Sequence, residues 1–192
     1  STQTEYTEGE IFEAILQNKN FNHMKLDYLT WVISGGDTLS TELKKRFDEW
    51  LGKHHSPTTI REGYGLTECC AASCFTPLNY YRPGSIGIPY PDTYYKIVDP
   101  GTDKVLPYGE EGEILLAGPT VMKGYLDMPE ETAETIREHK DGLKWVYTGD
   151  LGTMDEEGFI YFRGRAKRMI ISSGYNIYPA QLENIFDAHD KV

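Results

Sequence analysis

Near its start the chain carries apolar side chains at helical spacing. Within residues 8–18, Ile11, Ile15 and Leu16 fall on one face, with Phe12 beside them. Apolar positions three or four residues apart are typical of an amphipathic α-helix. The pattern therefore predicts a helix over these residues, ended by the polar stretch that follows.

A continuous run of aromatic and β-branched residues comes next, from Tyr28 to Ile33. Runs of this kind, without polar alternation, are typical of parallel strands buried on both faces. We therefore predict such a strand here. The polar and glycine-rich loop Ser34-Gly35-Gly36-Asp37 ends it.

A second helix is predicted from about Ser40, because Leu43, Phe47 and Trp50 again recur at helical spacing. Serine is a favoured N-cap residue, since its hydroxyl accepts a hydrogen bond from a free backbone N–H of the first turn. A strand, a glycine-pair turn and a helix start in succession present backbone N–H groups to a ligand. A plain strand-to-helix connection that needs small residues explains the same glycines.

The hexapeptide Gly63-Tyr64-Gly65-Leu66-Thr67-Glu68 stands at the corresponding place of a second unit. It follows a short extended piece, residues 58–60, and we predict that it forms a turn. Two such units in succession indicate the edge of an α/β layer. Ligands of such layers bind at the carboxyl ends of the strands.

The pattern changes near Asn79, where prolines and glycines become frequent and apolar runs become short. Such short runs separated by turn residues are typical of a small antiparallel sheet or an open barrel. One helix is predicted within this part, from Pro129 to about Glu138, with proline in its first turn. The predicted extended segments span residues 94–98, 113–117, 144–147 and 159–162.

From Arg165 onward the sequence predicts a strand at 169–171, a loop, and a helix that opens at Pro179. The predicted fold class is therefore α/β plus β. It comprises the edge of an α/β layer, a small antiparallel β-barrel-like subdomain, and the first strand and helix of a C-terminal α+β domain. The predicted boundaries place these parts at residues 1–80, 81–164 and 165–192.

Composition excludes some classes of partner. The 192 residues include 19 Lys and Arg against 30 Asp and Glu, a net charge of −11, with 39% hydrophobic residues. The hydrophobic fraction is that of a globular protein. The negative charge argues against nucleic acid or an anionic membrane surface as a partner. The sequence shows neither an apolar run long enough to cross a bilayer nor a signal-peptide pattern.

The cysteines Cys69, Cys70 and Cys74 are clustered, and no histidine lies near them at the spacing of a zinc site. His54 and His55 lie well upstream. We therefore expect reduced thiols and a cytoplasmic protein.

The hexapeptide also carries candidate chemistry. An aromatic ring, a hydroxyl and a carboxylate at Tyr64, Thr67 and Glu68 can stack on a base, donate to a phosphate and hold a hard cation. The two glycines allow positive φ or a close approach to a ligand. A tight turn with a solvated glutamate is the alternative interpretation.

Two further stretches offer groups that suit a nucleotide. In Tyr147-Thr148-Gly149-Asp150-Leu151, a carboxylate after glycine at the end of a strand can accept hydrogen bonds from the vicinal diol of a ribose. In Gly164-Arg165, the guanidinium offers several donors to hydroxyls or phosphate. A β-turn with a capping aspartate and a solvated arginine are the respective alternatives.

The order of these motifs resembles the adenylate-forming superfamily, which includes acyl-CoA synthetases, aryl-CoA ligases, luciferases and the adenylation domains of peptide synthetases. The likeness runs from about Tyr28 to the end of the chain. In chain order, the motifs that carry it are Gly35-Gly36, Tyr64-Gly65-x-Thr67-Glu68, Gly84-Ser85-Ile86-Gly87-Ile88-Pro89, Lys123-Gly124-Tyr125, Tyr147-Thr148-Gly149-Asp150 and Gly164-Arg165-x-Lys167.

The resemblance implies a role for each matching residue. Tyr64 would stack on adenine, Thr67 would bind the α-phosphate, and Glu68 would hold Mg²⁺. Asp150 would bind the ribose hydroxyls, and Arg165 would contact ribose or phosphate. Thr67 and Glu68 are thus the expected catalytic residues.

Other matching positions have expected roles in the pocket and in domain motion. Gly35, Gly36 and Gly65 would line the nucleotide pocket through their backbone. Lys167 stands at the position of the family's hinge, about which a small C-terminal domain swings between two poses. Ser173-Gly174-Tyr175 would lie near the tunnel for the thiol substrate.

The resemblance implies an ATP-dependent acid–CoA ligase with Mg²⁺ as cofactor and CoA as co-substrate. A carboxylic acid, expected to be of fatty acyl type, would become an acyl-AMP and then a CoA thioester. The chain lacks the family's phosphate-binding loop and its late lysine motif, so we expect a piece of a longer enzyme that is inactive by itself. We also expect self-association into a homo-oligomer through an exposed sheet edge.

Two other functions stay open from the sequence. The chain is also compatible with an adenylation domain that loads an amino or aryl acid onto a carrier protein. It is compatible too with a non-catalytic nucleotide-binding fragment. The identity of the acid and of the thiol acceptor is not encoded in these motifs.

Overall fold

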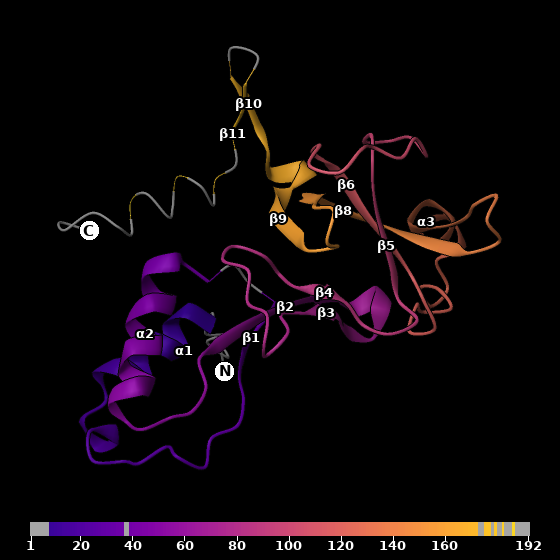
Figure 1. The fold of residues 1–192 in the computed structure, drawn as a ribbon. Coiled ribbons are helices and arrows are strands. Elements are labelled where there is room, and N and C mark those ends of the chain that lie inside the picture. The colour runs from indigo at the N-terminus through magenta and orange to yellow at the C-terminus, as the bar shows by residue number, and fades with distance from the viewer. Residues whose placement is uncertain are drawn as a thin grey trace.

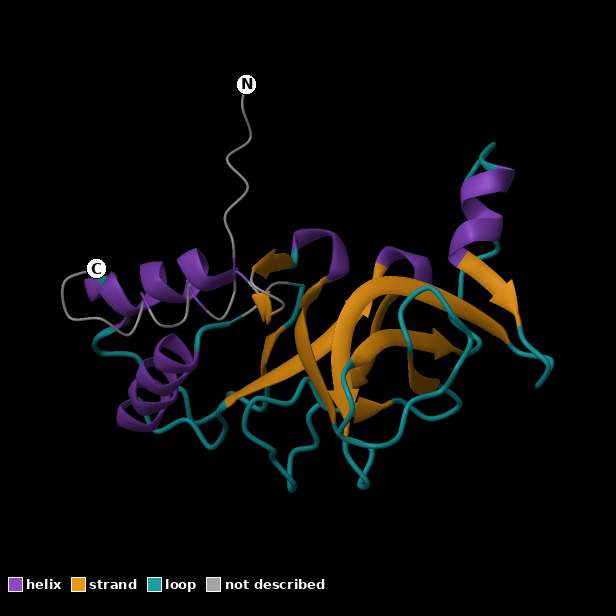
Figure 2. Cartoon of the chain, turned by 90° about the horizontal axis from the view of Figure 1, so that it is seen from above, coloured by secondary structure: helices purple, strands orange, loops and turns teal. Residues whose placement is uncertain are grey.

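A computed structural model describes residues 8–36, 39–172, 175–177, 179, 182 and 186 (Figure 1). Helices α1 and α2 lie at one end of the molecule and α3 at the other, with the strands between them (Figure 2). The helices are α1 (Glu8–Gln17), α2 (Thr41–Lys53) and α3 (Pro129–Thr135), and the 3-10 turns are η1 (Lys19–Phe21), η2 (Thr67–Cys69) and η3 (Ala166–Arg168). The strands are β1 (Val32–Ser34), β2 (Ile60–Leu66), β3 (Ala71–Phe75), β4 (Ile88–Pro89), β5 (Tyr94–Val98), β6 (Gly112–Ala117), β7 (Ile136–Glu138), β8 (Lys144–Met154), β9 (Ile160–Arg165), β10 (Ile170–Ser172) and β11 (Tyr175–Ile177).

The first sheet has the strand order β1-β2-β3-β4. Strand β1 pairs with β2 in parallel, as predicted, whereas the pairs β2–β3 and β3–β4 are antiparallel. The predicted strand from Tyr28 to Ile33 is longer than β1, which spans three residues. The reason is that β2 offers it partners over three residues, beginning at Ile60 opposite Val32.

The prediction that this strand is buried on both faces was wrong. Ile33 is 58% exposed and the neighbouring Trp31 is 46% exposed, while Ser34 is buried. Among the described residues β1 pairs with β2 alone and forms the edge of the sheet. The expected self-association through this edge stays a prediction.

Helices α1 and α2 pack against each other through an aromatic contact. The rings of Phe12 and Phe47 lie 4.7 Å apart, edge to face, and both side chains are buried. The sequence placed Ile11 on the inner face of the first helix, but Ile11 is 49% exposed and Phe12 takes the inner position. The predicted N-cap of α2 is confirmed, because the Ser40 hydroxyl accepts a hydrogen bond from the backbone N–H of Leu43 at 3.2 Å.

The hexapeptide Gly63–Glu68 does not form the predicted turn. Its first four residues are the second half of strand β2, and Thr67 begins the short turn η2. The extended piece predicted at 58–60 marks only the start of this strand. Backbone pairing with β3, Tyr64 opposite Cys74 and Gly65 opposite Ala72, keeps the glycine-rich segment extended.

The second sheet is antiparallel, as predicted, with strand order β5-β6-β8-β7 and with β9 also paired to β8. Strand β8 is longer than expected. It continues through Gly149 and Asp150 to Met154 because β6 and β9 pair with its second half. Asp150 therefore lies within a strand and not at its end.

The helix predicted from Pro129 to Glu138 is also shorter than expected. Helix α3 ends at Thr135, and Ile136 begins strand β7, opposite Val146 of β8. Ile136 packs against the buried cluster of the second sheet. In a longer helix this side chain would have belonged to a thin apolar face, whereas in β7 it is partly buried against the sheet core.

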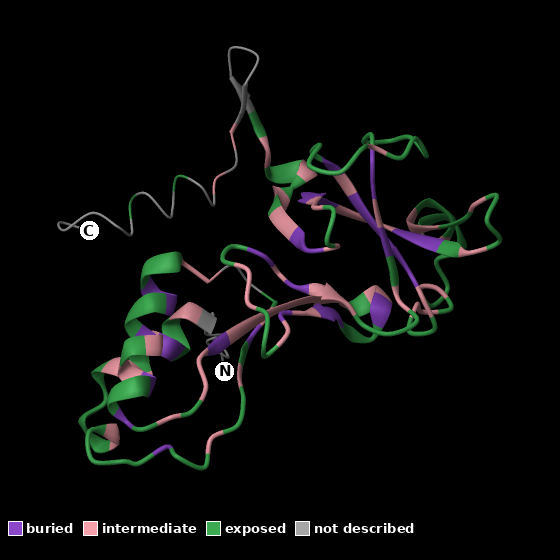
Figure 3. Cartoon of the chain, in the orientation of Figure 1, coloured by how far each residue is buried: buried purple, intermediate pink, exposed green. Residues whose placement is uncertain are grey.

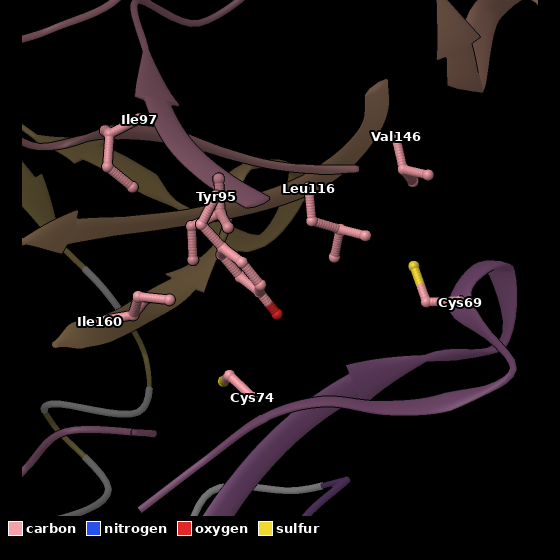
Figure 4. Close-up of a cluster of buried hydrophobic side chains, with 8 residues drawn as sticks. Cys69, Cys74, Tyr95, Ile97, Leu116, Val146 and Ile160 are labelled. Carbon is pink, nitrogen blue, oxygen red and sulfur yellow. The ribbon is translucent and has the colours of Figure 1, made fainter. Parts of the chain in front are cut away.

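The main core lies between the two sheets (Figure 4). Tyr95 of β5 points toward Cys74 of β3, and its hydroxyl makes a 2.5 Å hydrogen bond with that of Ser73. Backbone hydrogen bonds between Ile160 and the segment 86–87 also join the two parts. The buried residues of this cluster are Cys69, Cys74, Tyr95, Ile97, Ile114, Leu116, Val146 and Ile160.

The distribution of buried residues follows these contacts (Figure 3). They concentrate on the inner faces of the strands and on the face of α2 turned toward α1, while connecting loops are largely exposed. No helix in the part of the chain that the structure describes has the length and apolarity needed to cross a membrane.

At the C-terminal end, β10 and β11 form an antiparallel pair, with Ile170 opposite Ile177. The strand predicted at 169–171 is confirmed, shifted by one residue. Ser172, expected in the following loop, belongs to β10. Residues 173 and 174 and most of the helix predicted from Pro179 lie outside the described residues.

The described fold is thus a mixed α/β arrangement with two main sheets. The first sheet contains both parallel and antiparallel strand pairs, and the second is antiparallel. The finer assignments stay predictions. They are a barrel-like subdomain, a C-terminal domain, and the boundaries of the three parts at 1–80, 81–164 and 165–192.

Candidate functional site

The two sheets meet at a hydrogen bond between Tyr64 and Asp150. The Tyr64 hydroxyl on β2 donates to Asp150 Oδ2 on β8 at 2.6 Å, across 86 residues of sequence. Asp150 is 5% exposed. Burying a carboxylate costs free energy unless it is paired, so a buried aspartate at this position indicates a candidate functional residue.

The second oxygen of the same carboxylate is buried without a hydrogen-bond donor among the described residues. A charged residue, Arg165, lies opposite Asp150 on β9. The Arg165 Nε atom is 3.4 Å from Asp150 Oδ1, an ion pair rather than a well-directed hydrogen bond. The arginine side chain is 67% exposed, so solvent screens this pair strongly.

The local backbone explains how β8 presents Asp150. Gly149 has a φ of 69°, which glycine adopts without strain. The Thr148 hydroxyl donates to the Ile114 carbonyl at 2.6 Å and accepts from the Asp150 backbone N–H at 3.0 Å. Glu113 accepts from the Gly149 N–H at 3.0 Å. These bonds fix the strand around the carboxylate.

The pKa of the Asp150 carboxyl group is raised above its ordinary value, chiefly by burial. The hydrogen bond from Tyr64 and the charge of Arg165 lower this pKa, whereas the charge of Glu68 raises it. The pKa of the Tyr64 hydroxyl is raised too, first by burial and then by Asp150. This hydroxyl therefore stays protonated and donating at neutral pH.

A second carboxylate, Glu68, is also held by a tyrosine. The Tyr125 hydroxyl donates to Glu68 Oε1 at 2.5 Å, and the Met122 backbone N–H donates to the Glu68 carbonyl at 2.8 Å. Glu68 is half-buried. The structure therefore joins the loop before α3 to the turn η2 that follows β2.

The turn η2 has an unusual backbone. Thr67 is exposed, and its carbonyl accepts from the Cys70 N–H at 3.0 Å. Cys70 and Ala71 have φ values of 58° and 121°, which side-chain-bearing residues seldom adopt. Residues held in this region each cost about 1–3 kcal/mol and cluster at functional sites. Thr67 and Glu68 both lie in this turn, η2.

The glycines of the two motifs are explained largely by packing. A Cβ on Gly65 would lie 1.8 Å from the Ala71 carbonyl oxygen, so β3 can approach only glycine here. A Cβ on Gly35 would lie 3.1 Å from the carbonyl oxygen of Gly63, which places the end of β1 beside β2. Gly36 has a φ of 104° and is exposed.

The structure thus brings together Tyr64, Asp150 and Arg165, with Glu68 near enough to affect the Asp150 pKa. The expected roles of these residues, of Thr67 and of the glycines in binding a nucleotide stay predictions. Lys167 lies in η3, directly after β9, and is exposed. Ser173 and Gly174 lie outside the described residues, and of Tyr175 only the backbone, in β11, is described.

Sequence reasoning assigned no role to Tyr125 or Glu113. Tyr125 belongs to a motif already singled out, but 57 residues separate it from Glu68 and no local pattern links them. Glu113 reads as an ordinary polar residue at a strand start, 36 residues from the backbone group that it binds. The contact between Glu113 and the Gly149 N–H becomes visible only when β6 pairs with β8.

Within the described ranges, no cluster of three or more His, Cys, Asp or Glu side chains is arranged to enclose a metal ion. A hollow of about 440 Å³ lies beside α2, away from the carboxylates described above. Its lining residues are Thr41, Lys44, Lys45, Asp48, Glu49 and Tyr81. None of them belongs to the predicted site.

Comparison with known proteins identifies the family. The sequence pattern of the AMP-binding enzyme family matches residues 6–126. This chain belongs to the AMP-binding enzymes. The family that the order of motifs predicted is thereby confirmed. The match includes Tyr64, Glu68 and Tyr125.

Individual relatives align over nearly the whole chain. The long-chain-fatty-acid–CoA ligase of Bacillus subtilis is 40% identical over 186 residues, which are 95% of this chain and 31% of that protein. The 4-coumarate–CoA ligase-like 2 protein of Arabidopsis thaliana is 38% identical, with 95% of this chain and 32% of that protein covered. The chain therefore spans about a third of the length of these relatives.

A solved structure has the same fold. The ATP-bound structure of MatB from Rhodopseudomonas palustris superposes with a TM-score of 0.78 at 33% identity, covering 94% of this chain and 34% of that one. The mixed α/β arrangement of the two sheets is thus a recognised part of this family's fold.

Proposed function

We propose that a protein containing this chain is an AMP-forming acid–CoA ligase that activates a fatty acid, and that this chain supplies much of its nucleotide site. The observation that carries the proposal is Asp150 Oδ1, a buried carboxylate oxygen without a hydrogen-bond donor among the described residues. A buried acceptor of this kind is stabilised by a ligand that donates. The hydroxyls of a ribose are such donors.

The neighbours of Asp150 suit the rest of a nucleotide. Tyr64 offers an aromatic ring beside the carboxylate for an adenine base, while its hydroxyl holds Asp150 Oδ2. Arg165 carries a largely exposed guanidinium, free to reach a ribose hydroxyl or a phosphate. Thr67 is exposed on η2 and offers its hydroxyl to the α-phosphate.

The residues present also suit Mg²⁺ bound together with ATP. Two carboxylates, Asp150 and Glu68, lie close enough for one to raise the pKa of the other. They would repel the phosphates of a nucleotide unless a cation lay between. Mg²⁺ takes one or two protein carboxylates and fills its remaining positions with phosphate oxygens and water. Glu68 alone therefore suffices on the protein side, and the cation would neutralise charge on the phosphates.

The reaction proposed for the full-length protein has two steps. An oxygen of the substrate carboxylate attacks the α-phosphorus of ATP, and pyrophosphate leaves as the acyl-adenylate forms. The thiol of CoA then attacks the acyl carbon, and AMP leaves with the bonding electrons of the broken C–O bond. The residues of this chain act by holding and orienting the nucleotide, not by forming a covalent bond.

The names of the relatives support the substrate class. The Bacillus subtilis relative is a long-chain-fatty-acid–CoA ligase, and fatty acid and CoA are therefore the proposed substrates. An aromatic acid is the second candidate, because the Arabidopsis relative, a 4-coumarate–CoA ligase-like protein, is nearly as similar at 38% identity. Lys167 is proposed as the hinge, and the segment 173–175 as part of the thiol path.

Acid-dependent ATP–pyrophosphate exchange tests this function. The full-length protein is assayed over fatty, aryl and amino acids, and acyl-CoA formation is followed with the acid that responds. We expect exchange with long-chain fatty acids and thioester formation with CoA. Exchange with aryl acids alone would favour the second candidate, and no exchange with any acid, together with no AMP binding by calorimetry, would overturn the proposal.

A further inference from the structure

The loop before α3 is attached to the Glu68 turn at two points. One is the backbone bond from the Met122 N–H to the Glu68 carbonyl, at 2.8 Å. The other is the side-chain bond from the Tyr125 hydroxyl to Glu68 Oε1, at 2.5 Å. The first bond fixes the position of the Glu68 backbone, and the second fixes the direction of its carboxylate.

Tyr125 is itself firmly placed. Its backbone N–H donates to the Thr132 hydroxyl on α3 at 2.9 Å, and that hydroxyl donates to the Met128 carbonyl at 2.7 Å. The preceding Gly124 has a φ of 152°, and a Cβ there would lie 2.7 Å from the Thr132 side chain. The start of α3 therefore determines where the phenol points.

The contact engages only part of the carboxylate. Within the described residues, Glu68 Oε2 takes part in no hydrogen bond. The Tyr125 hydroxyl donates to Oε1 alone. One oxygen of Glu68 is thus held while the other can bind a cation.

We infer that Tyr125 is a positioning residue that sets the affinity of the Glu68 carboxylate for the nucleotide-bound metal ion. The inference rests on the function proposed above. A free glutamate side chain has several rotamers, and ordering it upon metal binding lowers affinity. The phenol orders it in advance, and groups that orient a metal ligand in this way typically change metal affinity about 10- to 100-fold when they are removed.

The test compares Tyr125→Phe with wild type in the full-length protein. Mn²⁺ binding in the presence of a non-cleavable ATP analogue is measured by electron paramagnetic resonance, which needs no turnover. We expect the Kd for Mn²⁺ to rise about 10-fold. The affinity for AMP alone should stay unchanged, because AMP binding requires no metal, and pyrophosphate exchange should recover as Mg²⁺ is raised.

Tyr161→Phe is the matched control. It removes another phenol-to-carboxylate bond, from Tyr161 to Asp155 Oδ2 at 3.0 Å on β9 and the turn before it, which belongs to no part of the proposed site. This variant should bind Mn²⁺ as wild type does. A double variant with Glu68→Gln completes the cycle, because a residue that acts through Glu68 has little further effect once the carboxylate is gone.

Each outcome decides the matter. Unchanged Mn²⁺ affinity in Tyr125→Phe, or an equal loss of AMP affinity, would overturn the positioning role while leaving the proposed function intact. An undiminished effect of Tyr125→Phe in the Glu68→Gln background would also overturn it. If wild type binds no Mn²⁺ with the ATP analogue, the proposed function fails, and the inference fails with it.

Discussion

Tyr64 and Asp150, on different sheets, share a 2.6 Å hydrogen bond that leaves one oxygen of the buried carboxylate without a donor. The bond fixes the direction of the Asp150 side chain, and the ring of Tyr64 lies beside it. Glu68 and Tyr125 form a second pair of the same chemistry. In each pair a phenol donates to one oxygen of a carboxylate and so orients it.

Replacing Asp150 with alanine should weaken AMP binding more than replacing Glu68 does. A hydrogen bond to a charged group contributes about 1.5–3 kcal/mol, so Asp150→Ala should raise the Kd for AMP roughly 10- to 100-fold. Glu68→Ala should change it little, because AMP needs scarcely any metal. Isothermal calorimetry on the full-length protein measures both, and equally small losses would mean that the nucleotide binds elsewhere.

The variant Tyr64→Phe should shift the pH dependence of AMP binding. The hydrogen bond from Tyr64 lowers the pKa of Asp150, so its removal raises that pKa further. Ribose hydroxyls donate to the ionised carboxylate, and affinity is therefore lost as pH falls through the Asp150 pKa. The acid-side loss should begin at a higher pH in the variant than in wild type.

Calorimetric titrations of AMP between pH 4 and neutrality, with Tyr161→Phe as control, would show this shift. Identical pH profiles for Tyr64→Phe and wild type would contradict the role given to the Tyr64 hydroxyl. A uniform loss of affinity at every pH would instead indicate that the ring position has changed.

Gly65→Ala should destabilise the fold severely. The new Cβ would lie 1.8 Å from the Ala71 carbonyl oxygen and 2.6 Å from the Ala72 Cα atom, so strand β3 would have to move. Overpacking of this kind costs about 3 kcal/mol or more. A lower melting temperature and reduced soluble expression are the expected results.

Gly52→Ala is the matched control, since the exposed Gly52 of α2 has no atom within 4 Å of the new Cβ. Alanine in a helix should gain roughly 0.5–1 kcal/mol over glycine. Thermal melting should therefore move the two variants in opposite directions. A neutral Gly65→Ala would show that β2 and β3 are not so closely paired.

Alkylation should distinguish the three cysteines. Cys69 and Cys74 are buried, and burial raises the pKa of each thiol to about 12. Cys70 is exposed. Because the thiolate is the reactive form, iodoacetamide at neutral pH should modify Cys70 first.

Peptide mass spectrometry after timed labelling would measure the three rates. Bound Mg²⁺ and ATP should slow the labelling of Cys70, which lies two residues after Glu68. Faster modification of Cys74 than of Cys70 would contradict the packing of β3 described here.

Much of the fold was predictable from local pattern. The helix from Ser40 was recognisable because its apolar spacing and its N-cap are properties of neighbouring residues. The strands of the second sheet were recognisable because turn residues separate them. The order of short motifs also indicated the family, since each motif keeps its residues in consecutive positions.

Element ends were predicted less well, because pairing partners set them. Local composition suggested a turn at Gly63–Leu66, but hydrogen bonding to β3 keeps that segment extended. Ile136 looked helical, yet pairing with Val146 draws it into the second sheet. In both places a contact with a distant segment outweighed the local preference.

The sequence by itself determined which groups are available: the tyrosine of β2, the threonine and glutamate directly after it, the aspartate after a glycine, and an arginine close behind. Only the tertiary structure decided which of them meet. Strand pairing puts Asp150 opposite Arg165 and packs the two sheets so that Tyr64 reaches Asp150, while α3 directs Tyr125 toward Glu68. Hydrogen bonds act over about 3 Å. The Tyr125–Glu68 contact joins residues that are 57 positions apart in the sequence, and the Tyr64–Asp150 contact joins residues that are 86 positions apart. Both contacts therefore depend on the packing of the whole fold and leave no local signal in the sequence.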